Sequence, residues 1–175
     1  MFKYYKNKKK IEDIYEFCKN EIFNFVGKNE RLKLSLESPI ILNLIDESVR
    51  VITAVNYMDV NSTFVPLSFE QEFKGKNALK LKNINIIGKV DRVDVSGDIL
   101  RVIDYKSGKA EANLKELYYG NKLQLFLYSC AMEKYFNKKA VGSFYLPLRN
   151  AYSTSDDYAY SLKGFFINED FSFKI

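Results

Sequence analysis

The chain has no histidine and no tryptophan, and its 175 residues include only two cysteines and three prolines. Without histidine, a histidine-activated nucleophile and a zinc site built on imidazole are both excluded. No segment matches the G-x-x-x-x-G-K-[ST] phosphate loop, so the chain itself is not expected to hydrolyse ATP. The available chemistry is thereby narrowed to carboxylates, lysine, tyrosine and cysteine.

Long apolar runs are also missing from the sequence. No segment approaches the roughly 18 apolar residues that a membrane span requires. The N-terminal sequence MFKYYKNKKK is basic but lacks the apolar centre of a secretory signal. The two cysteines, Cys18 and Cys130, suggest buried thiols in a reducing compartment. We therefore expect a cytoplasmic protein without a membrane partner.

The net charge of +5 is concentrated at the N-terminus. Residues 1–10 contain five lysines and no acid, so residues 11–175 are formally neutral. A lysine-rich tail can bind phosphates, but tails of this kind are often only solubilising, and both interpretations stay open. The length predicts a single domain over residues 11–175, preceded by the basic tail at 1–10.

A β-hairpin is predicted between Gly88 and Gly108, in the sequence GKVDRVDVSGDILRVIDYKSG. Ser-Gly-Asp at 96–98 supplies the reversal between two apolar-rich runs. Because side chains alternate faces along a strand, Asp104 and Lys106 share one face. Asp91 can join them if the strand register allows it.

Two carboxylates and a lysine at one place suit a metal-dependent hydrolase, in which the carboxylates hold a hard divalent cation and the lysine positions or polarises water. An Asp and a Lys two residues apart are more often a solvated strand edge. Against that alternative, Val102 and Ile103 lead directly into Asp104, and Ile86, Ile87 and Val90 precede Asp91. Burial of unpartnered carboxylates is costly, which favours the functional interpretation.

Three ordered motifs, GKVDRVD, VIDYKSG and YYGNKLQLFLY, resemble the RecB-like branch of the PD-(D/E)xK nuclease superfamily, in particular the C-terminal nuclease domain of AddAB-type B subunits. The flanking sequences FVPLSFEQEF, VGSFYLPLRN and LKGFFIN extend the resemblance over roughly residues 40–170. It implies an α/β, restriction-endonuclease-like core with a mixed central β-sheet flanked by helices. It also suggests that the chain is a domain excised from a larger subunit.

The resemblance implies a deoxyribonuclease that acts as an exonuclease on single-stranded DNA supplied by a partner helicase, in DNA repair and recombination, and cuts the strand ending 5′. Asp91 and Asp104 would hold Mg²⁺, for which Mn²⁺ could substitute, with the Tyr105 carbonyl oxygen as a further ligand. Lys106 would orient the attacking water and stabilise charge.

Further roles follow from the same resemblance. Glu70 fits an E-x-x-F pattern and is a candidate third acidic ligand, or else part of a solvated glutamate pair. Gln124 and Tyr128 correspond to the Q-x-x-x-Y motif that contacts the DNA backbone; the alternative for Gln124 is a core glutamine bonded to backbone. The metal-binding histidine of related nucleases is absent. The four-cysteine iron–sulfur cluster of the AddAB-type relatives is not expected, because two cysteines are too few.

The remaining elements are predicted from periodicity and turn residues. Helices are expected over residues 11–26, where Gly27 would end the helix, over 39–58, and up to about 136 after Gly108. Strands are expected over 63–73, 84–95, 99–107, 140–148 and 158–167, with a polar turn at 74–83. Cys18, Tyr119, Phe126 and Cys130 are interpreted as packing residues.

Two other functions compete with this interpretation. The first is a non-catalytic nucleic-acid-binding or scaffold module that keeps the fold. The second is a stand-alone nuclease of the CRISPR-adaptation type, which shares the motifs. The YYG-x-x-LQ stretch and the F-x-P entry to a strand argue against the second alternative.

Overall fold

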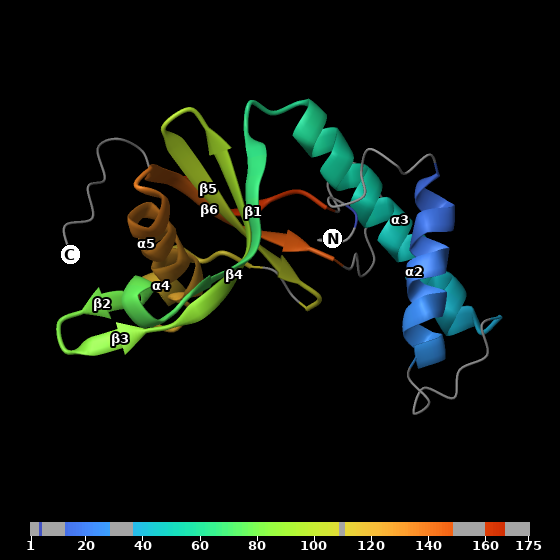
Figure 1. Cartoon of the computed structure of the whole chain (residues 1–175), viewed down its shortest axis with the longest axis horizontal. Helices are drawn as coiled ribbons and strands as arrows, with labels where there is room; N and C mark the ends of the chain where they lie inside the picture. The colour runs from blue at the N-terminus through green and yellow to red at the C-terminus, as the bar shows by residue number, and fades with distance from the viewer. Residues whose placement is uncertain (1–3, 5–12, 29–36, 109–110, 149–159, 167–175) are drawn as a thin grey trace. The chain divides into compact units, whose positions relative to one another are not determined.

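The computed structural model describes residues 4, 13–28, 37–108, 111–148 and 160–166, and Figure 1 shows the elements formed by these residues. The chain divides into two compact units, Met1–Asn61 and Ser62–Ile175. Most of the lysine-rich tail lies outside the described residues. Among the described residues, no helix combines the length and the apolar character that crossing a membrane demands.

The described residues of the first unit include the helices α2 (Ile14–Lys28) and α3 (Pro39–Val60). The start of α3 follows from Ser38 and Pro39: the Ser38 hydroxyl accepts a hydrogen bond from the Ile40 N–H at 3.4 Å, and Pro39 occupies the first turn. The apolar stripes of the two helices pack together around Cys18, Ile41 and Ile45, so the predicted packing role of Cys18 is confirmed. The predicted end of this helix at residue 26 is two residues early, because α2 continues through Gly27 to Lys28.

The second unit is built on a mixed five-stranded sheet in the order β1-β4-β5-β6-β7 (Figure 1). Its strands are β1 (Val65–Phe73), β4 (Gly88–Ser96), β5 (Ile99–Lys106), β6 (Lys139–Pro147) and β7 (Lys163–Phe166). β5 and β6 are parallel, and the other pairs are antiparallel. The predicted mixed sheet of a restriction-endonuclease-like fold is confirmed.

Helix α5 (Gln124–Phe136) covers one face of this sheet, as the parallel β5–β6 crossover requires (Figure 1). Met132 and Ala131 of α5 pack on Val93, Val102 and other strand residues in a core that excludes water. This core positions α5 on the sheet near the start of β4 and the end of β5, where the candidate site lies.

The prediction of one long helix up to residue 136 is wrong. The structure has a short helix α4 (Leu114–Tyr118) and then α5, which begins only at Gln124. Gly120 adopts φ +76°, a left-handed conformation that suits glycine and ends α4. The break matters for function, because it places Gln124 in the first turn of α5 instead of the middle of a helix.

The predicted polar turn at 74–83 is also wrong, and the strand predicted at 84–95 is confirmed only from Gly88 onward. Residues 75–77 form a 3₁₀ turn, η2 (Gly75–Asn77), and β2 (Leu79–Leu81) pairs with β3 (Ile84–Ile86) in a separate two-stranded sheet. The chain enters the main sheet only at Gly88. The predicted strand at 158–167 is observed as Lys163–Phe166, and its first two residues lie outside the described part of the chain.

Candidate functional site

Asp91 and Asp104 lie opposite each other where β4 and β5 separate. The paired register of the two strands ends at Arg92↔Ile103, so the next opposed positions are Asp91 and Asp104. Beyond that point, the Asp91 carboxylate takes the place of a backbone acceptor: the Tyr105 N–H donates to Asp91 Oδ2 at 2.8 Å. The register needed to bring the two carboxylates together is therefore present.

Lys106 projects from the same face of β5 as Asp104, as the two-residue period predicts. Its ammonium lies 2.7 Å from Asp104 Oδ2. The ammonium also lies 5.1 Å from the centre of the Tyr145 ring, at a distance typical of a cation–π contact. Asp104 is buried, whereas about a third of the Lys106 side chain remains exposed. In this ion pair the Asp104 carboxylate is buried, and the Lys106 ammonium is accessible to solvent.

Gln124 connects this ion pair to α5. Its Oε1 accepts a hydrogen bond from Lys106 Nζ at 2.8 Å, and its Nε2 donates to Asp104 Oδ1 at 3.1 Å. The same nitrogen donates to the Tyr128 hydroxyl at 3.1 Å, one helical turn further along α5. All three contacts are to side chains, so the alternative of a core glutamine bonded to backbone is wrong. Contact of Gln124 and Tyr128 with DNA stays a prediction.

The sheet holds the first turn of α5 directly. The buried Ser143 hydroxyl of β6 donates to the Leu125 carbonyl oxygen at 2.8 Å. Further along the helix, the Tyr128 ring stands edge-to-face on Phe73 of β1, with ring centres 5.9 Å apart. These two contacts fix the end of α5 that carries Gln124.

The electrostatics of the site follow from this burial. Burial raises the pKa of Asp104, the nearby Lys106 ammonium opposes that shift, and Asp91 adds to it, with a net rise. For Lys106, burial lowers the pKa, but close contact with Asp104, assisted by Tyr145 and Asp91, outweighs burial and raises the pKa above its ordinary value. Lys106 is therefore a cation at neutral pH and unsuited to act as a general base.

The carboxylates fit a hard divalent cation. Asp104 Oδ2 is buried and forms an ion pair with the Lys106 ammonium at 2.7 Å. A carboxylate oxygen can bind a hard cation in addition to such a pair, because it has more than one lone pair. Asp91 faces it across the strands, and the Tyr105 backbone lies beside Asp91. Among the described residues, no group of three or more His, Cys, Asp or Glu side chains is placed to hold an ion.

Glu70 is not brought into this group. Its carboxylate forms an ion pair with Lys89 instead, and both side chains are about half exposed. Glu70 also has φ +53°, a left-handed conformation that is uncommon outside glycine and asparagine. Its role as a third metal ligand stays a prediction that requires the Lys89 contact to break.

Sequence analysis missed Tyr145, whose ring flanks Lys106. Tyr145 is paired with Asp104 in the parallel β5–β6 register. A strand sequence does not specify which residue of a distant parallel strand lies beside it. No local signal could have identified Tyr145.

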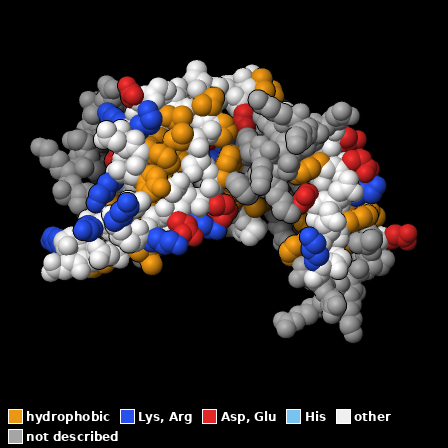
Figure 2. Space-filling model, viewed as in Figure 1, with side chains coloured by type: hydrophobic (Ala, Val, Ile, Leu, Met, Phe, Trp, Pro, Cys, Tyr) orange, Lys and Arg blue, Asp and Glu red, His pale blue; other side chains and the backbone are white. Residues whose placement is uncertain are grey.

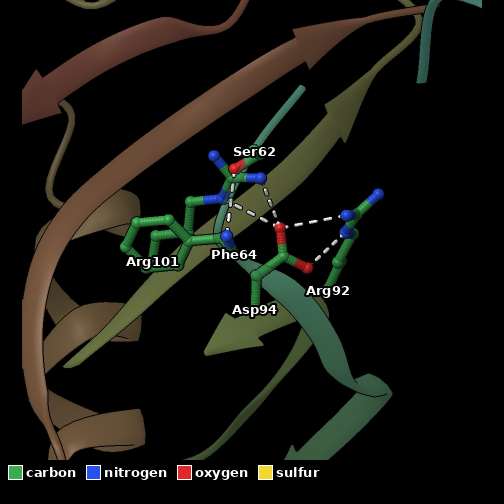
Figure 3. Close-up of polar contacts among 5 residues, drawn as sticks. All are labelled: Ser62, Phe64, Arg92, Asp94 and Arg101. Carbon is green, nitrogen blue, oxygen red and sulfur yellow. Dashed lines mark hydrogen bonds and ion pairs between the residues drawn. The ribbon is translucent and has the colours of Figure 1, made fainter. Parts of the chain in front are cut away.

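A buried ionic group on the opposite face of the sheet was also missed (Figure 3). Arg92 donates to Asp94 through Nε at 2.5 Å and Nη2 at 3.0 Å, and Arg101 Nε donates to Asp94 Oδ2 at 2.9 Å. Arg92 and Asp94 have no exposed surface. The Phe64 ring lies 4.7 Å from the Arg101 guanidinium. This group ties β4 to β5 directly behind the candidate site.

Two predictions about surface and burial need correction. Tyr119 is 74 % exposed, so it is not a packing residue; it stands edge-to-face with Tyr118, which is also exposed. Ile87 is 66 % exposed and does not provide an apolar setting for Asp91, whereas Val90 is fully buried. Both residues lie outside the elements that form the core: Tyr119 precedes α5, and Ile87 precedes β4.

Comparison with known proteins identifies related chains. Residues 26–165 match the model of the PD-(D/E)XK nuclease superfamily. The B subunit of an ATP-dependent helicase/deoxyribonuclease from Ruminiclostridium cellulolyticum is 28% identical over 161 residues, which cover 84% of this chain and 13% of that protein. Proteins of the same name from Clostridium tetani and Bacillus subtilis are 41% identical over 76 residues and 40% identical over 79 residues; the matches cover 41% and 38% of this chain.

The chain spans only a small part of these relatives, 6% of the Clostridium tetani protein and 7% of the Bacillus subtilis protein. The family match is broader, because it includes α3, the five-stranded sheet except for Phe166 at the end of β7, and the residues around Asp91, Asp104 and Lys106. The chain belongs to the PD-(D/E)XK nuclease superfamily.

Proposed function

We propose that the chain is a Mg²⁺-dependent DNA exonuclease domain that hydrolyses phosphodiester bonds within a helicase–nuclease complex acting in DNA repair and recombination. The observation that carries this proposal is the interlocked group of Asp91, Asp104, Lys106 and Gln124 at the point where β4 and β5 separate. The relatives are named as parts of a helicase/deoxyribonuclease, which supports a DNA substrate and a helicase partner.

Asp91 and Asp104 would hold the divalent ion, with the Tyr105 carbonyl oxygen as a further ligand. When bound, Mg²⁺ or Mn²⁺ would polarise a phosphoryl oxygen and acidify a coordinated water. Asp104 suits this position, because a cation would offset the burial and the Asp91 charge that raise its pKa.

Lys106 would act as a fixed positive charge. Its raised pKa keeps the ammonium protonated, and Gln124 Oε1 together with the Tyr145 ring holds it in place. A fixed cation stabilises the negative charge that develops on the phosphorus oxygens during attack, and its N–H groups can orient the attacking water. Gln124 would thereby position Lys106 and Asp104 together.

The test uses the purified 175-residue chain with two single-stranded DNA substrates of equal length, one linear and one circular. An exonuclease needs an end, so we expect degradation of the linear strand with Mg²⁺ or Mn²⁺, an intact circle, and no cleavage with a chelator. Asp104→Asn is the matched inactive control, because it keeps the side-chain shape and removes the charge. Cleavage of the circle would overturn the exonuclease assignment, and no cleavage of either substrate would overturn the nuclease activity.

A further inference from the structure

The segment immediately before the catalytic hairpin has an unusual charge. Residues 74–90 contain five lysines and no aspartate or glutamate. Because residues 11–175 are formally neutral, the rest of that range carries a net negative charge of equal size. Within residues 11–175, a net positive charge of five is therefore carried by one short segment beside the candidate site.

The fold presents this segment as an ordered arm. Leu79 of β2 is buried in the main core and Ile86 of β3 packs against it, so the β2–β3 hairpin is anchored at its base. Lys76, Lys80 and Lys82 are exposed and form no ion pair within the described part of the chain. By contrast, Lys74 and Lys89 at the two ends pair with Glu72 and Glu70. Figure 2 shows Lys and Arg side chains gathered at the lower left, where Figure 1 labels β2 and β3.

The turn of the hairpin gives a second, independent observation. Leu81 pairs with Ile84, so Lys82 and Asn83 form a two-residue turn, and Lys82 has φ +49°. Glycine or asparagine is preferred in this left-handed region, because a longer side chain is strained there. A lysine at this position is unfavourable for folding and supplies a cation at the tip of the arm. Strain of this kind is often retained at sites of function.

The arm is connected directly to the candidate site. Only Ile87, Gly88, Lys89 and Val90 separate the end of β3 from Asp91. Lys82, at the tip of the arm, is nine residues from Asp91, so extended chain between the two spans at most about 31 Å. A nucleic-acid strand that is cut beside Asp91 would therefore reach the lysines within a few nucleotides.

We propose that η2 and the β2–β3 hairpin together form a phosphate-binding arm, in which Lys76 of η2 and Lys80 and Lys82 of the hairpin hold the DNA backbone next to the cleaved bond. This inference rests on the proposed function and adds the surface that guides the strand to the site. The exposed lysines are point charges without a rigid fork, which suits contact with successive phosphates and not recognition of bases. The arm should therefore contribute affinity without sequence preference.

The experiment measures binding of a fluorescent single-stranded DNA to the full chain, with a chelator present to prevent cleavage, at salt concentrations from about 50 to 200 mM. Each lysine–phosphate contact contributes about 0.7 to the slope of log affinity against log salt for a single strand. The variant Lys76→Gln/Lys80→Gln/Lys82→Gln should therefore lower the slope by about 2. At about 0.1 M salt, its affinity should fall on the order of tenfold to 100-fold.

The matched control is Lys134→Gln/Lys139→Gln. These exposed lysines lie at the far end of α5 and at the start of β6, away from Gln124. This variant should keep the wild-type slope. Lys82→Gly is a second test, because relief of the left-handed strain should raise the melting temperature while DNA affinity falls.

The outcomes separate this inference from the proposed function. If the wild type cuts DNA but the triple variant keeps the wild-type slope and affinity, the arm does not bind DNA, and an acidic protein partner becomes its better occupant. If the triple variant loses slope but the wild type does not cut DNA, the arm is supported and the nuclease proposal fails. A wild type that neither binds nor cuts DNA would overturn both.

Discussion

Gln124 accepts a hydrogen bond from Lys106 at 2.8 Å, and this contact joins β5 to the first turn of α5. The same amide donates to Asp104, so its oxygen faces the cation and its nitrogen faces the carboxylate. Gln124 therefore holds both members of the ion pair at once. Because α4 ends at Tyr118 and Gly120 follows in a left-handed conformation, the chain can start α5 with Gln124 in its first turn.

Gln124→Ala should lower kcat for DNA cleavage about tenfold, the equivalent of about 1.4 kcal/mol in transition-state free energy. The reason is that Lys106 and Asp104 both lose a hydrogen-bond partner that orients them. The measurement is single-turnover cleavage together with the DNA dissociation constant and the melting temperature. The Q-x-x-x-Y resemblance predicts a different result, in which DNA affinity falls and the rate on bound DNA is unchanged.

Tyr128→Phe is the control for the Gln124 variant. It removes only the hydroxyl that accepts from Gln124 Nε2 and keeps the ring that packs on Phe73. We expect a smaller loss of rate than in Gln124→Ala. An equal loss in the two variants would mean that the Gln124–Tyr128 contact, and not the bond to Lys106, orients the site.

Asp104→Ala should abolish Mg²⁺ binding and DNA cleavage while the fold is kept. The substitution removes a buried charged oxygen that no other described carboxylate replaces on β5. Titration calorimetry with Mg²⁺ measures the effect directly. The control is Asp98→Ala, a fully exposed carboxylate in the β4–β5 turn, which should bind the ion like the wild type. Equal Mg²⁺ affinity in Asp104→Ala and the wild type would refute the metal site.

Lys106→Ala should keep Mg²⁺ and lose most cleavage. Loss of a positive charge 2.7 Å from Asp104 should leave the carboxylate with equal or slightly higher affinity for the ion. Lys134→Ala, at the far end of α5, is the control with unchanged rate. A Lys106→Ala variant that cuts at the wild-type rate would show that the lysine only balances the Asp104 charge.

Much of this site was predictable because its geometry is local. Asp104 and Lys106 share a face through the two-residue period of one strand, and Gln124 and Tyr128 share a face through one turn of a helix. The Ser-Gly-Asp reversal also sets the register of β4 and β5, and this register places Asp91 opposite Asp104. Each of these relationships is contained in a short local stretch of sequence.

The missed features depend on contacts between distant segments. Tyr145 reaches Lys106 through the parallel β5–β6 register, which is set by packing of α5 and not by any turn. The β2–β3 hairpin escaped notice because its strands are three residues long and lysine-rich, and its turn has a lysine where glycine or asparagine is expected. Tertiary anchoring by Leu79 overrides that weak local preference.

The Cys130 thiol should be unreactive at neutral pH. Burial, and to a lesser extent the Glu133 carboxylate, raises its pKa to about 11. At pH values near 8, a disulfide reagent should therefore react slowly with Cys130 in the native chain and rapidly after unfolding. Rapid reaction in the native chain would contradict the burial of this side chain.

The same shift has a consequence for stability in alkali. Between the ordinary thiol pKa of 9.0 and about 11, the folded chain keeps a proton that the unfolded chain has lost. The free energy of unfolding should therefore fall as pH rises through this window, by roughly 1–2 kcal/mol from this thiol. The difference in the free energy of unfolding between the wild type and Cys130→Ala, measured against pH, separates the contribution of this thiol from the titration of lysines and tyrosines. A difference that is constant with pH would exclude this contribution.

Asp94→Ala should destabilise the fold by about 3–5 kcal/mol, measured by denaturant unfolding. Asp94 is the shared carboxylate of Arg92 and Arg101, and its removal leaves buried guanidinium groups without it. This loss reflects the desolvated charge that remains and is larger than the net contribution of the intact group. Asp94→Asn, which keeps one acceptor oxygen for the guanidinium groups, should lose less, and the exposed Asp98→Ala should lose under about 1 kcal/mol. Because Asp94 faces away from Asp91 and Asp104, the Mg²⁺ affinity of each folded Asp94→Ala molecule should equal that of the wild type. A lower Mg²⁺ affinity in the folded variant would mean that the ionic group of Arg92, Asp94 and Arg101 also sets the position of Asp91 along β4.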